Sequence, residues 1–497
     1  MSLAITLVVL LLSFTSGCRA ASSEVGALLA FKRALTIPPQ AADFFATWDA
    51  TTTTPCNFSG IECDLAGRVT AICMRGKGVA AASVPWSGVC GALPRLVTLY
   101  LPENKLSGGI HGVRACVGLR NLSLAFNNFS GVMPDLSPLT KLRDLSLLSN
   151  NFSGVVPDLS PLTELHSLDI SHNFFFGAFP WAALAAMPSL EGLALGYNPS
   201  LERTDPFPIE VTKLINLTWL YLPEASIAGV IPPEIGNLVN LVDLEIAHNY
   251  LTGEIPAEFT KLTELSQIYL RNNSLRGELP AGFGRLTKLE VFDLSMNNLT
   301  GNLSELRSLT QLRVLRLYNN SFTGELPQSL GSMALFEEID VTANSLSGPI
   351  PPGMCNKQGT FGLYMYMENN NFSGEIPATY GRCKKLCQFW VGRNLLSGGV
   401  PEGLWALPNI TAIGLAGNQF TGRIGNGIGN AMSLTFLFLA QNRFSGVIPS
   451  SIGNATNLRI IDMGLNEISG KIPESIGKLT QLKRLYLAGN SITGTIP

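Results

Sequence analysis

One pattern repeats along this chain every 23 to 27 residues from Leu96 to Pro497. It is clear in NLVDLEIAHNYLTGEIP (Asn240 to Pro256) and again in SLTFLFLAQNRFSGVIP (Ser433 to Pro449). The ninth position of the pattern identifies seventeen copies: Asn104, Asn127, Asn150, Asn173, Asn198, Ala225, Asn249, Asn273, Asn297, Asn320, Asn344, Asn370, Asn394, Asn418, Asn442, Asn466 and Asn490. A single copy is too short to bury its own apolar face, so successive copies must stack on one another.

This period and pattern indicate a leucine-rich-repeat solenoid of the α/β type. Leucines at positions 1, 4 and 6 of each copy point inward, while positions 3 and 5 point outward because side chains alternate along a strand. We therefore expect a right-handed superhelix with one long parallel sheet on its concave face. The ninth-position asparagine can satisfy backbone groups of neighbouring copies, which predicts an internal asparagine ladder. A degenerate copy around Val69, Ile72 and Met74 precedes the array.

The two ends of the chain suggest how it is divided. The apolar run from Ile5 to Phe14 is followed by Cys18-Arg19-Ala20, which is typical of a secretory signal and too short to span a bilayer. A buried N-terminal helix is the alternative. We expect a signal peptide at 1–20, an N-terminal cap at 21–68 and repeats at 69–497, the last one incomplete. Because the array stops in mid-repeat without a polar cap, we expect a fragment or truncated product; a natural secreted short form is the alternative.

Cysteine spacing favours an oxidising compartment. Removal of Cys18 with the signal leaves eight cysteines. Short spacing in the cap and one-repeat spacing elsewhere predict three disulfides: Cys56 with Cys63, Cys90 with Cys116, and Cys355 with Cys383. Cys73 and Cys387 have no obvious partner, so we expect free or buried thiols there.

Asn-X-Ser/Thr sites fit a secreted glycoprotein, although a repeat that reads NNxSG creates such sites automatically. The predicted acceptors are Asn57, Asn121, Asn128, Asn151, Asn216, Asn272, Asn298, Asn302, Asn319, Asn371, Asn409 and Asn454.

The sequence argues against an enzyme. Its four histidines lie in different copies and form no close set with cysteines or carboxylates, so we expect no metal. The stretch GRIGNGIG (Gly422 to Gly429) lacks the lysine and the strand-to-helix context of a phosphate loop. No Gly-X-Ser-X-Gly elbow is present, and we expect no cofactor. A net charge of −2 with 14% charged residues gives no long basic face, which disfavours nucleic acid and membrane surfaces as partners.

The outward positions of the strands are the informative surface. Large rings and isolated charges alternate there over eight copies, which cover roughly 34 Å at the usual spacing between strands. An extended peptide of about ten residues has that length. Exposed aromatic rings on a solenoid can lack any binding role, but aromatic residues and arginine are also the residues that anchor interfaces. The predicted ligand-binding residues are Trp219, Tyr221, Asp243, Glu245, Tyr269, Arg271, Arg316, Tyr318, Glu338, Asp340, Tyr364, Tyr366, Gln388, Trp390 and Arg393.

The LxGxIP ending of the copies, the cap from Trp48 to Cys63 and the secretory signal together resemble the extracellular part of plant leucine-rich-repeat receptor kinases. Four segments are similar to the HAIKU type: DPFPIEVTKLINLTWLYL (205–222), LTGNLSELR (299–307), GPIPPGMC (348–355) and EIPATYGRCKKL (375–386). The resemblance implies a secreted peptide hormone on the inner face and a shorter leucine-rich-repeat coreceptor kinase near the last copies. It also implies a cytoplasmic kinase that this chain lacks, and a membrane attachment only through a missing C-terminal segment. The expected location is secreted, or on the extracellular face of the plasma membrane.

One departure from that resemblance concerns the ligand. Receptors of this group often place arginines at positions 3 and 5 of a late copy, where they hold the terminal carboxylate of the peptide. Here those positions are Gln388 and Trp390, with Arg393 nearby. Either the ligand is held differently or it has been lost, and we hypothesise retained binding with altered specificity. The alternative function is a secreted decoy or an inhibitor of a microbial enzyme that uses the same face.

Overall fold

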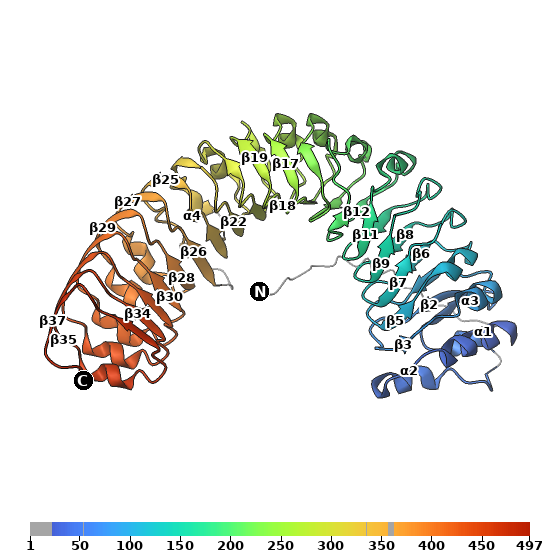
Figure 1. Cartoon of the computed structure of the whole chain (residues 1–497), viewed down its shortest axis with the longest axis horizontal. Coiled ribbons are helices and arrows are strands. Elements are labelled where there is room, and N and C mark those ends of the chain that lie inside the picture. Colours follow the sequence, from blue (N-terminus) through green and yellow to red (C-terminus); the bar gives the residue numbers. More distant parts are fainter. Residues whose placement is uncertain (1–21, 53, 334, 356–361) are drawn as a thin grey trace. The chain divides into compact units, whose positions relative to one another are not determined.

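The computed structural model describes residues 22–52, 54–333, 335–355 and 362–497, so the predicted signal at 1–20 lies outside the described residues. The chain divides into an N-terminal unit, Met1–Glu202, and a C-terminal unit, Arg203–Pro497. Figure 1 shows the same layered construction in each unit.

In the N-terminal unit every copy supplies a short strand to a parallel main sheet. The first strand, β2 (Val69–Cys73), comes from the degenerate copy and pairs with β4 in register. On its other side β2 pairs antiparallel with β1 (Ile61–Cys63). The remaining strands are β4 (Thr98–Tyr100), β6 (Asn121–Ser123), β8 (Asp144–Ser146), β10 (Ser167–Asp169) and β12 (Gly192–Ala194).

The main sheet of the C-terminal unit is parallel and in register over its length, apart from one shift between Leu363 and Tyr364. Its strands are β14 (Trp219–Tyr221), β16 (Asp243–Glu245), β18 (Gln267–Tyr269), β20 (Val291–Asp293), β22 (Val314–Arg316), β24 (Glu338–Asp340), β26 (Leu363–Tyr366), β28 (Leu386–Trp390), β30 (Ala412–Gly414), β32 (Phe436–Phe438), β34 (Ile460–Asp462) and β36 (Arg484–Tyr486). Within this unit the even-numbered strands follow the concave side in Figure 1 and the odd-numbered strands the outer side.

A second set of parallel strands follows the asparagine of each copy. In the N-terminal unit these are β3 (Ala80–Ala81), β5 (Lys105–Gly108), β7 (Asn128–Val132), β9 (Asn151–Gly154), β11 (Phe174–Gly177) and β13 (Ser200–Leu201). In the C-terminal unit they form two sheets. One has β15 (Ala228–Val230), β17 (Tyr250–Gly253), β19 (Ser274–Gly277) and β21 (Asn298–Leu299); the other has β23 (Thr323–Glu325), β25 (Ser345–Gly348), β27 (Asn371–Gly374), β29 (Leu395–Gly399), β31 (Gln419–Gly422), β33 (Arg443–Gly446), β35 (Glu467–Lys471) and β37 (Ser491–Thr493).

Short helices, mostly single 3-10 turns, return the chain to the next main strand. In the N-terminal unit these are α3 (Trp86–Ala92), η3 (His111–Ala115) and η4 (Trp181–Ala186). In the C-terminal unit they are η5 (Ile209–Lys213), η6 (Pro233–Asn237), η7 (Ala257–Lys261), η8 (Phe283–Arg285), η9 (Ser304–Ser308), α4 (Leu330–Met333), η10 (Ala378–Arg382), η11 (Glu402–Ala406), η12 (Asn426–Asn430), η13 (Ser450–Asn454) and η14 (Glu474–Lys478).

The asparagine at the ninth position ties each copy to the one before it. Asn297 is typical: its Nδ2 donates to the carbonyl of Leu294 in its own copy and to that of Leu270 in the preceding copy, both at 3.0 Å. Its Oδ1 accepts from the backbone N–H of Leu275, also at 3.0 Å. One side chain therefore satisfies buried donors and acceptors in two copies, and the predicted ladder is present.

Ala225 occupies a ladder position but has no side-chain amide. The asparagine of the next copy, Asn249, makes an additional hydrogen bond to its backbone. Asn249 Oδ1 accepts from two backbone N–H groups in the preceding copy, those of Ala225 at 3.2 Å and Ile227 at 2.9 Å. The backbone at this copy is therefore still satisfied from one side.

The residue just before the ladder asparagine has a positive φ in most copies. At the non-glycine residues the values lie between 50° and 58°, as at Glu224 (φ 50), His248 (φ 55) and Arg393 (φ 53), and at Gly417 and Gly489 they are 69° and 74°. This left-handed conformation turns the chain out of the main sheet and is strained for residues with a side chain. Further on, Gly253 (φ 74) makes the turn that ends the second strand, where a Cβ would press on Val230.

The N-terminal cap covers the first repeat strands. It contains α1 (Ser22–Arg33), η1 (Pro39–Ala41), α2 (Ala42–Ala46) and η2 (Pro55–Asn57). Trp48 is buried against Phe45 and Phe58. The buried Glu24 carboxylate accepts from Arg68 Nε at 2.7 Å and from the Val69 N–H at 3.0 Å, which fastens α1 to β2.

The structure joins the three cysteine pairs that the spacing predicts, Cys56–Cys63, Cys90–Cys116 and Cys355–Cys383. Cys73 and Cys387 are free and half-buried. Burial raises the pKa of the Cys73 thiol to about 11, so this sulfur is a poor nucleophile at neutral pH. The expected leucine-rich-repeat solenoid with parallel sheets is confirmed.

Replacement of Asn297 by alanine tests the ladder. The variant leaves the Leu270 carbonyl and the Leu275 N–H without their shared partner inside the protein. Since each buried unpaired group costs about 1–3 kcal/mol, we expect a loss of roughly 2–4 kcal/mol in unfolding free energy, measured by chemical denaturation. The matched control is Gln311→Ala, an exposed amide on the same unit, which should change stability by less than about 0.5 kcal/mol. Equal effects of the two substitutions would rule out the structural role of the ladder.

Candidate functional site

The outward side chains of the main sheet in the C-terminal unit form two columns, because the strands pair in register. The first column is Trp219, Asp243, Gln267, Val291, Val314, Glu338, Tyr364, Gln388, Ala412, Phe436, Ile460 and Arg484. The second column is Tyr221, Glu245, Tyr269, Asp293, Arg316, Asp340, Tyr366, Trp390, Gly414, Phe438, Asp462 and Tyr486. Most predicted binding residues thus lie side by side on one face, and most are half-buried.

Three carboxylates gather near the start of this face, and we call Asp243, Glu245 and Asp293 the acidic segment. Burial raises the pKa of Asp243 to about 6. For Glu245, burial followed by the nearby charge of Asp243 raises the pKa to about 7. Burial also raises the pKa of Asp293, although its carboxylate accepts from the N–H and the hydroxyl of Ser295, at 3.1 and 2.5 Å. The acidic segment therefore holds carboxyl groups whose ionised forms are poorly stabilised by solvent, so they bind protons more readily than exposed carboxyls do.

Two buried polar atoms beside the acidic segment form no hydrogen bond with the described residues, Asp243 Oδ1 and Arg271 Nε. Arg271 still acts electrostatically, because its charge opposes the rise in the pKa of Glu245. Tyr269, between the carboxylates, donates its hydroxyl to Gln267 Oε1 at 3.0 Å. The face therefore presents polar groups whose bonding capacity the protein itself leaves unused.

An ion pair between Arg316 and Glu338 lies in the middle of the face. Arg316 donates two parallel hydrogen bonds to Glu338, from Nε and Nη2, both at 2.7 Å. Its Nη1 also lies 3.8 Å from Asp293 Oδ2. These contacts raise the pKa of Arg316 and hold the guanidinium in place. Although the sequence predicts Arg316 and Glu338 as separate binding residues, they are chiefly partners of each other.

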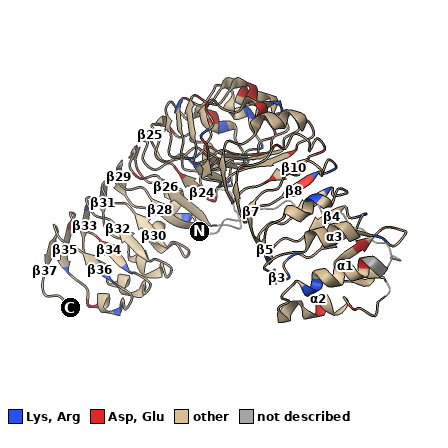
Figure 2. Cartoon of the chain, turned by 45° about the vertical axis from the view of Figure 1, so that its right-hand side comes forward, with Lys and Arg blue, Asp and Glu red and all other residues tan. Residues whose placement is uncertain are grey.

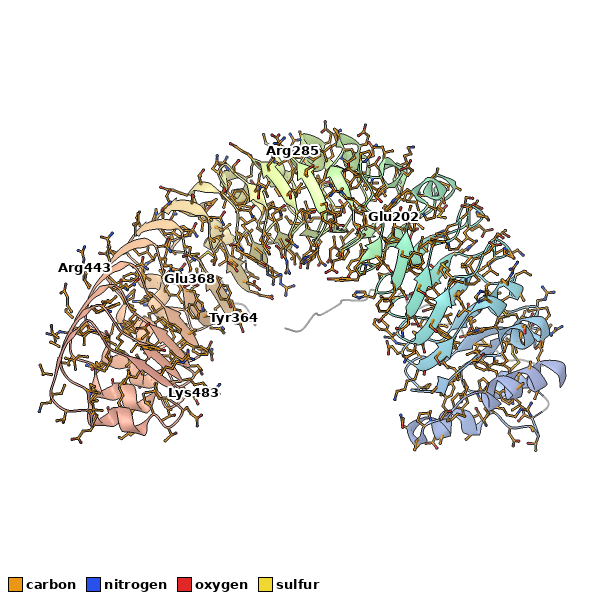
Figure 3. The ribbon with its side chains drawn as sticks, viewed as in Figure 1. Glu202, Arg285, Tyr364, Glu368, Arg443 and Lys483 are labelled. Atoms are coloured by element: carbon orange, nitrogen blue, oxygen red, sulfur yellow. A yellow bond between two sulfur atoms is a disulfide. The ribbon has the colours of Figure 1, made fainter. Side chains whose placement is uncertain are left out.

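Aromatic residues dominate the face beyond Asp340. Tyr366 and Trp390 both donate to Gln388 Oε1, at 3.1 and 3.0 Å. The Trp390 ring lies 5.5 Å from that of Phe438, and Phe438 stacks on Phe436 at 6.5 Å. Tyr364 is more exposed and extends from the concave side, opposite Arg443 on the second sheet (Figure 3).

Three predicted residues lie beyond the strand ends, outside the two columns. Arg271 and Tyr318 follow β18 and β22 and are half-buried. Arg393 is exposed in the turn after β28, where its Nη1 donates to Asn369 Oδ1 at 3.4 Å. At the first strand of the face, Trp219 and Tyr221 pack on each other with ring centroids 5.8 Å apart.

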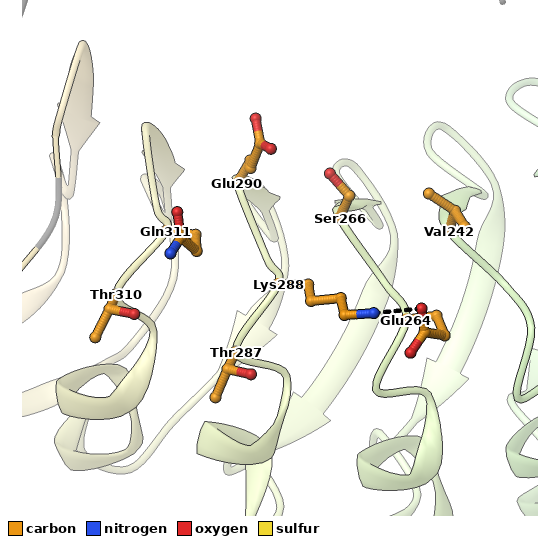
Figure 4. A pocket seen from close by; sticks show the side chains of 8 residues that line it. All are labelled: Val242, Glu264, Ser266, Thr287, Lys288, Glu290, Thr310 and Gln311. Carbon is orange, nitrogen blue, oxygen red and sulfur yellow. Dashed lines mark hydrogen bonds and ion pairs between the residues drawn. The ribbon is translucent and has the colours of Figure 1, made fainter.

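A hollow of about 590 Å³ lies away from the two columns (Figure 4). Its lining comes from the segments before β16, β18, β20 and β22, and Lys288 and Glu264 form an ion pair of 2.5 Å across it. No predicted binding residue takes part. Along the ribbon, the positions of Lys and Arg are interspersed with those of Asp and Glu rather than gathered into one stretch (Figure 2). Within the described ranges, no three His, Cys, Asp or Glu side chains are grouped as metal ligands.

The predicted glycosylation acceptors are exposed except Asn121, which is half-buried in β6 and contacts Thr98. Exposure makes attachment sterically feasible at the other positions.

Sequence reasoning did not assign binding roles to Asp293 or Gly414. The strand pattern placed Asp293 in the second column, but its contacts with Ser295 and Arg316 depend on rotamers that a single sequence does not reveal. Gly414 carries a signal that the sequence does contain, since a glycine at an outward strand position removes a side chain from the face.

Three family models match parts of the chain. A leucine-rich repeat N-terminal domain matches residues 21–64, a leucine-rich repeat region matches 208–352 and a leucine-rich repeat matches 432–492. Among curated proteins, Receptor-like protein kinase 7 of Arabidopsis thaliana is 40% identical over 178 residues, which are 36% of this chain and 16% of that protein. The chain therefore corresponds to a small part of that relative's length.

Solved structures match nearly the whole chain. The Arabidopsis receptor kinase HAESA in complex with the peptide hormone IDA and the co-receptor SERK1 is 34% identical, with a TM-score of 0.84 over 96% of this chain and 83% of that one. The HAESA ectodomain with an N-terminally extended IDA peptide is 31% identical, with a TM-score of 0.78 over 95% and 86%. A TDR receptor is 28% identical, with a TM-score of 0.69 over 87% and 86%. Of the helices described, none has the length and apolar character needed to cross a bilayer.

The raised pKa values of Asp243 and Glu245 predict a pH-dependent stability. Unfolded carboxyls titrate near pH 4, whereas these two titrate at about 6 and about 7 in the folded protein. The folded state thus binds more protons between these values, and stability must fall as pH rises from about 4 to above 7. Substitution of both by Asn and Gln should remove at most about 5 kcal/mol of the change in unfolding free energy between pH 4.5 and 8, and less where solvent screens these half-buried groups. The control is Glu254→Gln, an exposed carboxyl at the second sheet, which should leave the pH profile unchanged; an unaltered profile in the double variant would contradict the assignment.

Proposed function

Because the chain belongs to the leucine-rich-repeat ectodomains of plant receptor kinases, we propose that it binds an extended peptide along the two columns of the C-terminal unit. The observation that carries this proposal is the in-register alignment of half-buried aromatic and charged side chains from β14 to β28. Aromatic and arginine side chains held in this way supply large contact areas at little entropic cost.

The dimensions of the face support a peptide rather than a small compact ligand. Eight strands at the usual spacing cover roughly 34 Å. An extended chain of about ten residues has the same length. The hollow in Figure 4 lies off this path and contributes none of the predicted residues.

The charges of the face support a basic residue in that peptide. Arg316 is engaged by Glu338, so its charge is not available to Asp243 and Glu245, and an incoming cation would favour the ionised forms of these two carboxyls. A lysine, an arginine or an N-terminal amine near Asp243 and Glu245 would supply the donors that Asp243 Oδ1 lacks.

The relatives suggest the setting in which such binding would act. HAESA was solved with a peptide hormone and a co-receptor. We infer by analogy that this ectodomain works outside the cell with a secreted peptide and a shorter leucine-rich-repeat coreceptor kinase. Signalling would pass through a kinase that is not in this chain. The segments 205–222, 299–307, 348–355 and 375–386 favour the HAIKU type within the family.

A library of synthetic ten-residue peptides tests the proposal. We expect the purified, glycosylated chain to retain basic and aromatic members, with dissociation constants measurable by calorimetry. The paired change of Tyr269 and Tyr366 to alanine should weaken the best binder at least about tenfold, which corresponds to roughly 1.4 kcal/mol.

The matched control is Arg443→Ala, because Arg443 is exposed on the second sheet, away from the columns. Retention of no peptide, or equal weakening by the control, would reject peptide binding at this face. Capture of a microbial enzyme instead would favour a secreted inhibitor.

A further inference from the structure

Beyond Tyr366 the two columns change character. Trp390, Phe436 and Phe438 project outward from β28 and β32, and the strand between them presents only Ala412 and Gly414. We call these three rings, with the small residues beneath them, the aromatic shelf. All three rings are half-buried, so part of each remains accessible.

Gly414 makes the shelf continuous. Strands β28 and β32 are separated by β30, which places their backbones roughly 9.6 Å apart. The rings of Trp390 and Phe438 nevertheless lie 5.5 Å apart, so they lean toward each other over the intervening strand. A Cβ at Gly414 would overlap the Trp390 indole. The missing side chain is therefore what leaves room for the Trp390 ring beside Gly414.

Two hydrogen-bond donors next to the shelf are already used. Gln388 Oε1 accepts both the Tyr366 hydroxyl and the Trp390 indole N–H. These two donors are thus unavailable to an oxygen atom of a ligand. What Trp390 offers is its apolar ring surface.

The charges around the shelf are unfavourable for an anion. None of the outward positions of β26 to β34, all of which the structure describes, is lysine or arginine. Asp462 occupies the second column next to Phe438, and Glu368 lies in the turn after β26. Arg393 is electrostatically coupled to Glu368, and Arg484 on β36 is two strands from Phe436.

We propose that the aromatic shelf is the binding subsite for an uncharged, apolar end of the peptide ligand and that it discriminates against a carboxylate. This inference rests on the proposed function and specifies the ligand class. Stacking of an aromatic or aliphatic residue on Trp390 and Phe438 removes apolar surface from water without leaving a buried charge unpaired.

The positions of the two subsites define the spacing within the ligand. Glu245 on β16 and Trp390 on β28 are six strand spacings apart, roughly 29 Å. The ligand therefore carries a basic residue and, about nine residues along the extended chain, an apolar one.

Four synthetic eleven-residue peptides with a lysine near one end separate the possibilities. The other end is phenylalanine amide, phenylalanine with a free carboxylate, glutamate amide or serine amide, and dissociation constants are measured by calorimetry. We expect the phenylalanine amide to bind at least tenfold tighter than the glutamate amide, and the free carboxylate to bind more weakly than the amide.

Variants of the full ectodomain assign that preference to the shelf. Trp390→Ala with Phe438→Ala should remove the advantage of phenylalanine over serine while keeping the dependence on lysine. Gly414→Ala, which displaces Trp390 without deleting it, should reduce the same advantage, and Arg443→Ala should leave it unchanged. Melting temperatures identify any variant that fails to fold, and Gly414→Ala serves as the milder test.

Different results would contradict the shelf and peptide binding as a whole. A preference for the free carboxylate, lost in Arg484→Ala or Arg393→Ala, would overturn the shelf while leaving peptide binding intact. Equal affinity for all four peptides would also overturn it. If none of the peptides bound, nor any member of the ten-residue library, the proposed function itself would fail and the shelf with it.

Discussion

The satisfaction of buried backbone groups is the constraint on which the rest of this protein depends. Every copy leaves its strand through a turn whose carbonyl and N–H groups are cut off from water, and unpaired groups of this kind are costly. The ladder asparagines solve the problem in every copy except that of Ala225, as Asn297 does for Leu270, Leu275 and Leu294. The same side chain also bonds to the neighbouring copy. The hydrogen bonds that satisfy one turn therefore also fix the register between adjacent strands.

That register turns a repetitive scaffold into a specific surface. Once the strands are aligned, any outward residue has fixed neighbours one copy away on each side. Half-burial then follows from crowding along the column, and it raises the pKa values of Asp243 and Glu245 although neither belongs to the core. The scaffold therefore fixes where side chains stand, while the residue types at two positions per copy decide the chemistry.

Sequence reasoning was most effective where the period operates. Inward leucines, the ladder, the two cysteine pairs one repeat apart and the two columns all follow from phased spacing, and each is present in the structure. Contacts between particular side chains could not be predicted from the repeat spacing. The Arg316–Glu338 pair, the double acceptance by Gln388 and the dual service of Asn249 beside Ala225 depend on rotamers chosen across neighbouring copies, where no period applies. Glycosylation and the binding roles of individual residues remain predictions.

The left-handed turn before each ladder residue restricts variation in an unexpected place. Its side chain leaves the backbone in one fixed direction at the margin of the sheet, as His248, Asn272, Asn319 and Arg393 do. Valine, isoleucine and threonine are poorly tolerated at positive φ, and none of them occurs among the positive-φ residues of the described chain. Acid, base, amide, aromatic and thioether side chains all do occur. The residues before the ladder positions thus form a third row of variable side chains, beside the two columns. The positive φ of the backbone excludes β-branched residues from this row.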